Sequence, residues 1–141
     1  MTNCKEINWH STRLDRMMNI RVYGAPTGVP ILVFPTQDAM SDNFENFGMI
    51  EAVADDLRRG RIQFFCVDTV DTETWSNLWG DKTWRAQRQE QYYAYIIDEV
   101  VPRIYMENTS KRLPIAAGCS LGGLHAAIVF FRRPDLFDGV L

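Results

Sequence analysis

Residues 113–123 read LPIAAGCSLGG, and the interpretation of the whole chain starts from this stretch. A short apolar run leads into GCSLG at positions 118–122, and small apolar residues typical of a helix follow. Ser120 has a glycine two positions before it and another two positions after it, which is the G-x-S-x-G pattern of a serine on a sharp strand-to-helix turn. Such a turn brings its neighbours so close that only glycine avoids a clash. The stretch therefore predicts Ser120 as a nucleophile, with Gly118 and Gly122 as the glycines that the turn requires.

Two other interpretations of this turn stay open. Ser120 can simply cap the helix that follows, or the helix N-terminus can hold a phosphate, although G-x-G-x-x-G and the lysine of a P-loop are both absent. Cys119 is a poorer candidate nucleophile than Ser120, because it does not have a glycine two residues away on each side. We expect Cys119 to be a small buried side chain, and Cys66, at the end of an apolar strand, to be buried in the same way.

The rest of the chain alternates strand-like and helix-like segments. Strands are predicted at residues 7–10, 18–23, 31–34, 62–67 and 115–117, and another apolar run begins at 137–141. Helices are predicted at residues 41–59, 83–106 and 124–131, with Pro102 kinking the last turns of the second. This order predicts an α/β fold with a mostly parallel sheet covered by helices on both faces.

Composition limits the class of protein. With 141 residues, of which 46% are hydrophobic, we expect one globular domain. A net charge of -3 without a basic cluster favours neither nucleic acid nor an anionic membrane as a partner. The three widely spaced cysteines predict a reducing compartment, and without a signal peptide or membrane-length apolar run we expect the protein in the cytoplasm.

The last residues of the sequence, 138–141, bear on whether the domain is complete. Residues 138–141 look like the start of a buried parallel strand with no cap or polar tail, so we expect a domain that is incomplete at its C-terminus. Only about twenty residues follow Ser120. That leaves little room for the base and acid that a serine nucleophile requires.

These features together resemble the α/β-hydrolase superfamily, and more closely its esterase branch, which includes esterase D and carbohydrate-esterase-like proteins. The matching segments are the leading strands, the strand 31–34, DEVVPRI at 98–104, the turn at 118–123 and RPDLFDGV at 133–140. The resemblance covers nearly the whole chain. It implies the order nucleophile, acid, histidine, with the last two on loops after later strands that this sequence does not contain. His10 and His125 do not match the family's catalytic position, so the triad histidine and acid are expected to be missing from this chain.

The resemblance also implies an oxyanion hole, a pair of backbone amides that hold the developing negative charge. The loop after strand 31–34 supplies one amide in the family, and here it reads PTQD at 35–38, which makes Thr36 or Gln37 the donor. The second donor is the amide of Leu121, directly after the candidate nucleophile.

Acidic and aromatic residues follow strand 62–67, at the carboxyl edge where α/β proteins bind ligands. Asp68 has two open interpretations. It is either a contact for the substrate or, like Asp71 and Glu73, a residue that forms turns and helix caps. The same stretch contains Trp75, Trp79 and Trp84. These aromatic side chains are expected either to line a pocket for a sugar or aryl ester or to fill the space between loop and sheet. We expect His125 to be a buried structural residue and His10 to lie at the surface. No ligand spacing for a metal is present, and no cofactor is expected.

Three functions remain open. The first is a serine esterase that cleaves a small-molecule carboxylic ester through an acyl-enzyme at Ser120. An acyltransferase with an alcohol in place of water would have the same sequence features. The third is a catalytically silent fragment or binding module with the hydrolase fold, because serine without a base is a poor nucleophile. An open sheet edge would also favour a homodimer.

Overall fold

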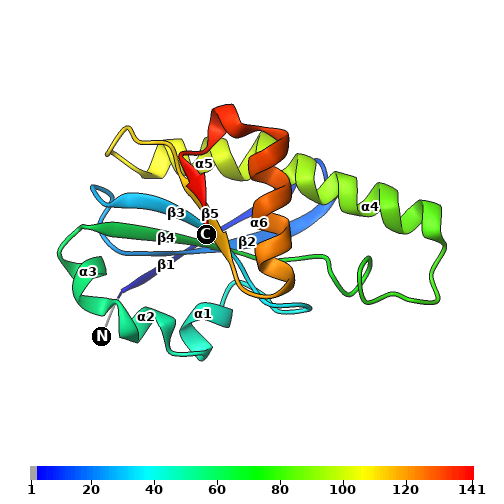
Figure 1. Cartoon of the computed structure of the whole chain (residues 1–141), viewed down its shortest axis with the longest axis horizontal. Helices are drawn as coiled ribbons and strands as arrows, with labels where there is room; N and C mark the ends of the chain where they lie inside the picture. The colour runs from blue at the N-terminus through cyan, green and yellow to red at the C-terminus, as the bar shows by residue number, and fades with distance from the viewer. Residues whose placement is uncertain (1–2) are drawn as a thin grey trace.

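The computed structural model describes residues 3–141, which form one six-stranded mixed sheet with helices on both faces (Figure 1). The order across the sheet is β1-β2-β4-β3-β5-β6. The strands are β1 (Cys4–Ser11), β2 (Arg16–Tyr23), β3 (Val29–Phe34), β4 (Ile62–Val67), β5 (Ile115–Gly118) and β6 (Gly139–Val140). The predicted α/β fold is therefore confirmed.

Strand direction divides the sheet into two parts. β1 and β2 form an antiparallel hairpin, and β2 is also antiparallel to β4. β4, β3, β5 and β6 are mutually parallel, as crossover connections through helices require. β3 and β4 are buried along nearly their whole length, which explains why their sequences VPILVF and IQFFCV are almost continuously apolar.

Helices cover the two faces unequally (Figure 1). One face carries α4 (Lys82–Tyr95), η1 (Ile96–Val100), α5 (Val101–Glu107) and α6 (Leu121–Arg132), and the larger apolar core lies beneath them. The opposite face carries three short helices, α1 (Asn43–Asn46), α2 (Met49–Ala52) and α3 (Ala54–Arg58), over a smaller core. A short 3-10 helix, η2 (Pro134–Leu136), connects α6 to β6.

The continuous helix predicted at residues 41–59 is wrong. Gly48 has φ +80°, in the left-handed region, and this separates α1 from α2. Val53, at φ −113°, separates α2 from α3. None of the three helices has a side-chain cap, so their apolar face against the sheet is what holds them.

The helix predicted at residues 83–106 is one long helical segment with an irregular middle. Its central turn, η1, is a π-helix that ends two residues before Pro102. Proline has no amide proton to donate, so a regular helix would leave the carbonyl of Asp98 without its partner. The irregular turn therefore lies directly before Pro102, and a kink in the last turns of the helix stays a prediction.

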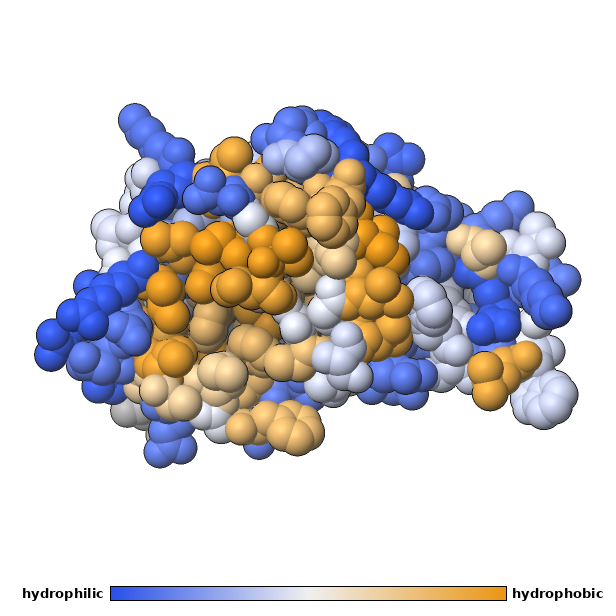
Figure 2. Space-filling view, viewed as in Figure 1, coloured by the Kyte–Doolittle hydropathy of each residue, from blue (hydrophilic) through white to orange (hydrophobic). Residues whose placement is uncertain are grey.

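Apolar surface gathers at the end of the described chain. Figure 2 shows an apolar area around the C-terminal residue, and Leu141 is 75% exposed. Within residues 3–141, β6 is hydrogen-bonded to β5 on one side only. None of the helices in this part of the chain is long and apolar enough to cross a membrane.

Candidate active site

Ser120 stands at the turn between β5 and α6 in a strained backbone conformation. Its φ is 59° and its ψ is −127°, a combination that residues other than glycine rarely adopt. Ser120 is exposed, and its hydroxyl has no hydrogen-bond partner among residues 3–141. The turn therefore presents a free hydroxyl at the carboxyl edge of the parallel strands.

Two glycines make this turn sterically possible. A Cβ on Gly118 would overlap the carbonyl group of Gly122, across the turn. A Cβ on Gly122 would overlap the carbonyl oxygens of Phe34 and Pro35, at the end of β3. The first turn of α6 thus crosses directly over the end of β3, and only a residue without a side chain fits there.

Among residues 35–38, directly after β3, the amide of Gln37 is left free. The amide of Thr36 donates to Asn43 Oδ1 at 3.2 Å, and the amide of Asp38 donates to Asp71 Oδ2 at 3.2 Å. Ala39 closes the turn with a 3.0 Å bond to the carbonyl of Thr36. The amide of Gln37 has no acceptor among residues 3–141.

A second free amide lies at the start of α6. Leu121 is the first residue of that helix, so its N–H has no acceptor within the helix, and none is formed elsewhere in residues 3–141. Phe34 is paired with Gly118 in the β3–β5 register. The loop that carries Gln37 and the turn that carries Leu121 therefore leave neighbouring strands at the same edge of the sheet.

His125 is buried within the core and is not available to Ser120. Its Nε2 lies 2.9 Å from Asp71 Oδ1, and its Nδ1 lies 3.0 Å from the hydroxyl of Tyr93. Both ring nitrogens are therefore engaged, and the ring has no exposed surface. His10 lies on the outermost strand β1, where its Nε2 is 3.2 Å from Asp15. The expectations of a buried structural His125 and a surface His10 are both confirmed.

The acidic residues after β4 stabilise the loops around the site. Asp68 Oδ1 accepts from the amide of Ser41 at 2.8 Å, and its carbonyl accepts from the Tyr92 hydroxyl at 2.7 Å. Glu73 forms ion pairs with Arg16 and Arg88. Nothing in the sequence indicates that Asp71 and His125 pair, or that the hydroxyl of Tyr93 binds the same ring.

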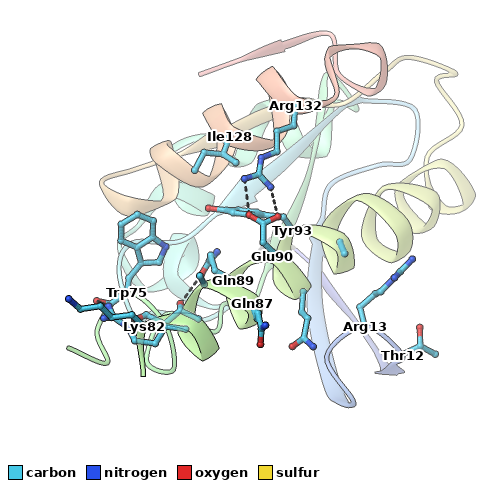
Figure 3. Close-up of a pocket in the computed structure, with 15 residues that line it drawn as sticks. Thr12, Arg13, Trp75, Lys82, Gln87, Gln89, Glu90, Tyr93, Ile128 and Arg132 are labelled. Atoms are coloured by element: carbon cyan, nitrogen blue, oxygen red, sulfur yellow. Dashed lines mark hydrogen bonds and ion pairs between the residues drawn. The ribbon is translucent and has the colours of Figure 1, made fainter. Parts of the chain in front are cut away.

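A cavity of about 990 Å³ lies between α4, the segment after β4 and α6 (Figure 3). Trp75, Tyr93 and Ile128 border it, together with the charged side chains of Lys82 and Arg132. Ser120 does not line this cavity. Trp75 reaches it from the loop and stands edge-on to the ring of His125, with centroids 6.4 Å apart.

The other two tryptophans of this region do not line that cavity, and Trp79 does not fill the space between loop and sheet. Trp79 is 99% exposed and Trp84 is 46% exposed. Their apolar surface lies open on the outer side of the loop and on the first turn of α4.

The cysteines differ from one another in exposure. Cys119 is exposed, so the prediction of a buried side chain is wrong: the strained turn directs it outward beside Ser120. Cys66 is buried, as expected, and burial raises the pKa of its thiol. In the part of the chain that the structure describes, no three histidine, cysteine or acidic residues are grouped as metal ligands.

This chain matches a known protein family and is similar in fold to solved structures. A family model described as "Putative esterase" matches residues 11–141. No curated protein sequence matches the chain. Among solved structures, FphF, a fluorophosphonate-binding serine hydrolase of Staphylococcus aureus, is 17% identical with a TM-score of 0.72, over 99% of this chain and 55% of that protein.

Two further solved structures are similar over 99% of this chain. An S-formylglutathione hydrolase from Agrobacterium tumefaciens is 18% identical with a TM-score of 0.75, and 59% of its length is covered. A CE1 ferulic acid esterase from the fungus Anaeromyces mucronatus is 12% identical with a TM-score of 0.75, and 57% of its length is covered. The chain thus spans little more than half the length of these structures, and the likeness to them shows the fold. Because the family model covers nearly the whole sequence, the chain belongs to this esterase family, with the α/β-hydrolase fold.

Proposed function

We propose that this chain carries the nucleophile and oxyanion hole of a serine esterase that acts on a small-molecule carboxylic ester. The observation that carries the proposal is the strained, exposed Ser120 together with two backbone amides without acceptors. One belongs to Leu121, the next residue, and the other to Gln37, in the loop after the neighbouring strand β3. Strain at a single residue of this kind persists only where surrounding structure enforces it, and it is concentrated at functional sites. Membership of an esterase family supports the reaction class.

In this mechanism the Oγ of Ser120 attacks the ester carbonyl carbon while its proton passes to a base. The carbonyl oxygen becomes an oxyanion, which accepts hydrogen bonds from the amides of Leu121 and Gln37. Collapse of this intermediate breaks the bond to the alcohol, which leaves with a proton and gives an acyl-serine. Water then releases the acid. The amide of Thr36 is a weaker candidate than that of Gln37, because it already donates to Asn43.

The base and its carboxylate come, in this proposal, from polypeptide outside these 141 residues. His125 has both ring nitrogens engaged inside the core, and His10 lies on the far edge strand. Neither histidine can take the proton of Ser120 without a rearrangement. The chain by itself is then expected to react at Ser120 slowly and to turn over little ester.

A second candidate function is a folded but catalytically silent module. The observation that favours it is the same unpartnered hydroxyl, because no base lies within hydrogen-bond distance of Ser120 in residues 3–141. Without a base, serine stays protonated and attacks esters poorly near neutral pH.

Mass spectrometry after treatment with an alkyl fluorophosphonate separates these functions. The esterase proposal predicts one adduct, formed slowly because the base is missing, on the peptide that contains Ser120, and none in Ser120→Ala. Ser110→Ala is the matched control, because that hydroxyl donates to Asn108 and accepts from the amide of Arg112, both close by in the chain, and it should leave labelling unchanged. Absence of an adduct in the folded wild-type chain would favour the silent module.

An assay with p-nitrophenyl acetate tests the missing base. We expect turnover by the wild-type chain to exceed that of Ser120→Ala only slightly. Loss of triad members leaves a residual acceleration of about 10³ to 10⁴ over water at most. Serine-dependent turnover at rates typical of esterases, about 1 to 10³ per second, would show that the base lies within this chain.

Trp75 and Asp68 are the two candidate residues for contact with the substrate. Trp75 is the better candidate, because its half-exposed ring borders the cavity in Figure 3. Asp68 is the weaker one, because its carboxylate already accepts from the amide of Ser41.

We also propose that two copies of the chain associate through the β6 edge. Among residues 3–141, the backbone of β6 is paired on one side only, and Leu141, directly after it, is 75% exposed. Unpaired edges with apolar neighbours favour association. Sedimentation over a concentration series is expected to show a dimer that weakens in Leu141→Lys, whereas a monomer at all concentrations would contradict the proposal.

A further inference from the structure

We infer that the buried pair of Asp71 and His125, held in place by Tyr93, positions the loop that presents the Gln37 amide. These three side chains come from the segment after β4, from α6 and from α4. The inference rests on the proposed oxyanion hole. It assigns positioning residues to that site, none of which touches Ser120.

The ring of His125 is held from all sides. It has no exposed surface, and the rings of Phe34, Trp75, Tyr92 and Tyr93 have their centroids 5.7 to 6.4 Å from its own. Burial raises the pKa of Tyr93 to about 12, which keeps its hydroxyl protonated and able to donate to Nδ1. With its proton on Nε2, His125 donates to Asp71, so every polar atom of the ring has a partner.

Asp71 transmits this arrangement to the loop after β3. Its carboxylate is 1% exposed, and each of its two oxygens has a different partner. Oδ1 faces His125, and Oδ2 accepts from the amide of Asp38 at 3.2 Å. A buried carboxylate is tolerated only when such partners compensate it, so the position of Asp71 is tightly determined.

The loop depends on that contact. Asp38 has φ +64°, in the left-handed region that few residues other than glycine, asparagine and aspartate adopt. Its amide is bound by Asp71, and its Oδ1 accepts from the hydroxyl of Ser76 at 2.5 Å. The same Ser76 accepts from the side-chain amide of Gln37 at 2.7 Å. These contacts fix the residue after Gln37 and the side chain of Gln37, and they leave its backbone amide free.

His125 also lies on the helix that begins directly after Ser120. The pair of Asp71 and His125 therefore connects the loop that carries the Gln37 amide to α6, the helix that carries the Leu121 amide. Distances between such donors matter, because a displacement of about 1 Å in a catalytic arrangement costs about 100-fold in rate. This shared support distinguishes the pair from a buried network that only adds stability.

The test compares Asp71→Ala with Asp71→Asn and Glu73→Ala. Alanine removes the acceptor for the Asp38 amide. Asparagine still offers its Oδ1 to that amide, while its Nδ2 donates to a His125 that carries its proton on Nδ1 instead. Glu73→Ala removes two ion pairs from the same segment and makes no contact with the loop, so it controls for loss of stability.

Amide hydrogen exchange by NMR is the first measurement. At matched global stability, we expect the Asp38 amide to exchange at least about 10-fold faster in Asp71→Ala than in wild type. The exchange rate should stay close to wild type in Asp71→Asn and Glu73→Ala. Unchanged exchange and unchanged chemical shifts at Gln37 and Asp38 in folded Asp71→Ala would overturn the inference.

The rate of fluorophosphonate labelling at Ser120 is the second measurement. Asp71→Ala should label about 10-fold more slowly or worse, Asp71→Asn should recover most of the rate, and Glu73→Ala should match wild type. If Asp71→Ala labels as fast as wild type although its loop is altered, the positioning role is refuted. Failure of wild type to label at all refutes the proposed function, whereas amide exchange still reports on the loop.

Discussion

Gly118 and Gly122 face each other across the turn at Ser120, so closely that a Cβ on Gly118 would overlap the carbonyl group of Gly122. Backbone atoms, which cannot rotate away as a side chain can, form this contact. We predict that Gly118→Ala and Gly122→Ala each lower the free energy of unfolding by about 3 kcal/mol or more. Urea unfolding followed by circular dichroism measures the loss.

Gly139→Ala is the control for this prediction. Gly139 is also in a strand at the parallel end of the sheet, but no atom lies within 4 Å of its Cβ position. It should change stability by about 0.5 kcal/mol or less. Equal losses in all three variants would show that the turn is not sterically constrained.

The strain at Ser120 predicts an increase in stability when the side chain is removed completely. Ser120→Gly relieves a backbone conformation that costs about 1 to 3 kcal/mol, while it adds about 0.5 to 1 kcal/mol of unfolded-state entropy. We therefore expect Ser120→Gly to be more stable than Ser120→Ala by about 1 kcal/mol. Thermal and urea unfolding of the two variants test this, and a less stable glycine variant would mean that the turn is unstrained.

Glu99 ties the β1–β2 hairpin to the π-helical turn η1. Its carboxylate accepts from Trp9 Nε1 at 3.0 Å, from Ser11 Oγ at 2.8 Å and from the amide of Arg13 at 3.2 Å. Removal leaves these donors unsatisfied, so Glu99→Ala should cost about 2 to 3 kcal/mol of unfolding free energy. The neighbouring Asp98→Ala removes only an exposed ion pair to Arg13 and should cost about 1 kcal/mol or less. Similar costs in the two variants would contradict this role for Glu99.

Alkaline pH is predicted to destabilise the fold through Tyr93. Burial raises the pKa of its phenol from 10.0 to about 12, so above pH 10 the unfolded chain releases a proton that the folded chain keeps. The stability that this pKa shift contributes is therefore fully present below pH 10, and it is lost as the pH rises towards 12. Urea unfolding at pH 9 to 11.5 should show a steeper decline for wild type than for Tyr93→Phe, and identical slopes would refute the shift.

The parallel part of the fold was predictable because its signals are local. The apolar runs of β3 and β4 and the G-x-S-x-G spacing each depend on residues close together in the chain. The steric demand on Gly118 is of this kind, because its contact partner is only four residues away. The boundaries of the first helical region were not predictable, because the apolar spacing of residues 41–59 continues through Gly48, whose φ is set by how the short helices dock.

The site beyond Ser120 depended on contacts between distant segments. Asp71 and His125 are 54 positions apart, and Tyr93 is 32 positions from His125. Nothing in their sequence spacing indicates that these three side chains contact one another in the core. Likewise, the choice of Gln37 over Thr36 as the candidate amide follows from the side chain of Asn43, which occupies the Thr36 donor only after α1 docks.

Local sequence thus establishes the strand, the turn and the helix around Ser120, since hard-sphere overlap with Gly122, four residues away, allows glycine alone at position 118. Glycine at position 122 is instead required by the carbonyl oxygens of Phe34 and Pro35, which the tertiary fold brings close. Which amides stay free, and which histidine is removed from reach of the hydroxyl, depends on the packing of the sheet against α4 and α6. Burial makes each polar group there find a partner, and the partners come from whichever segments the fold brings together.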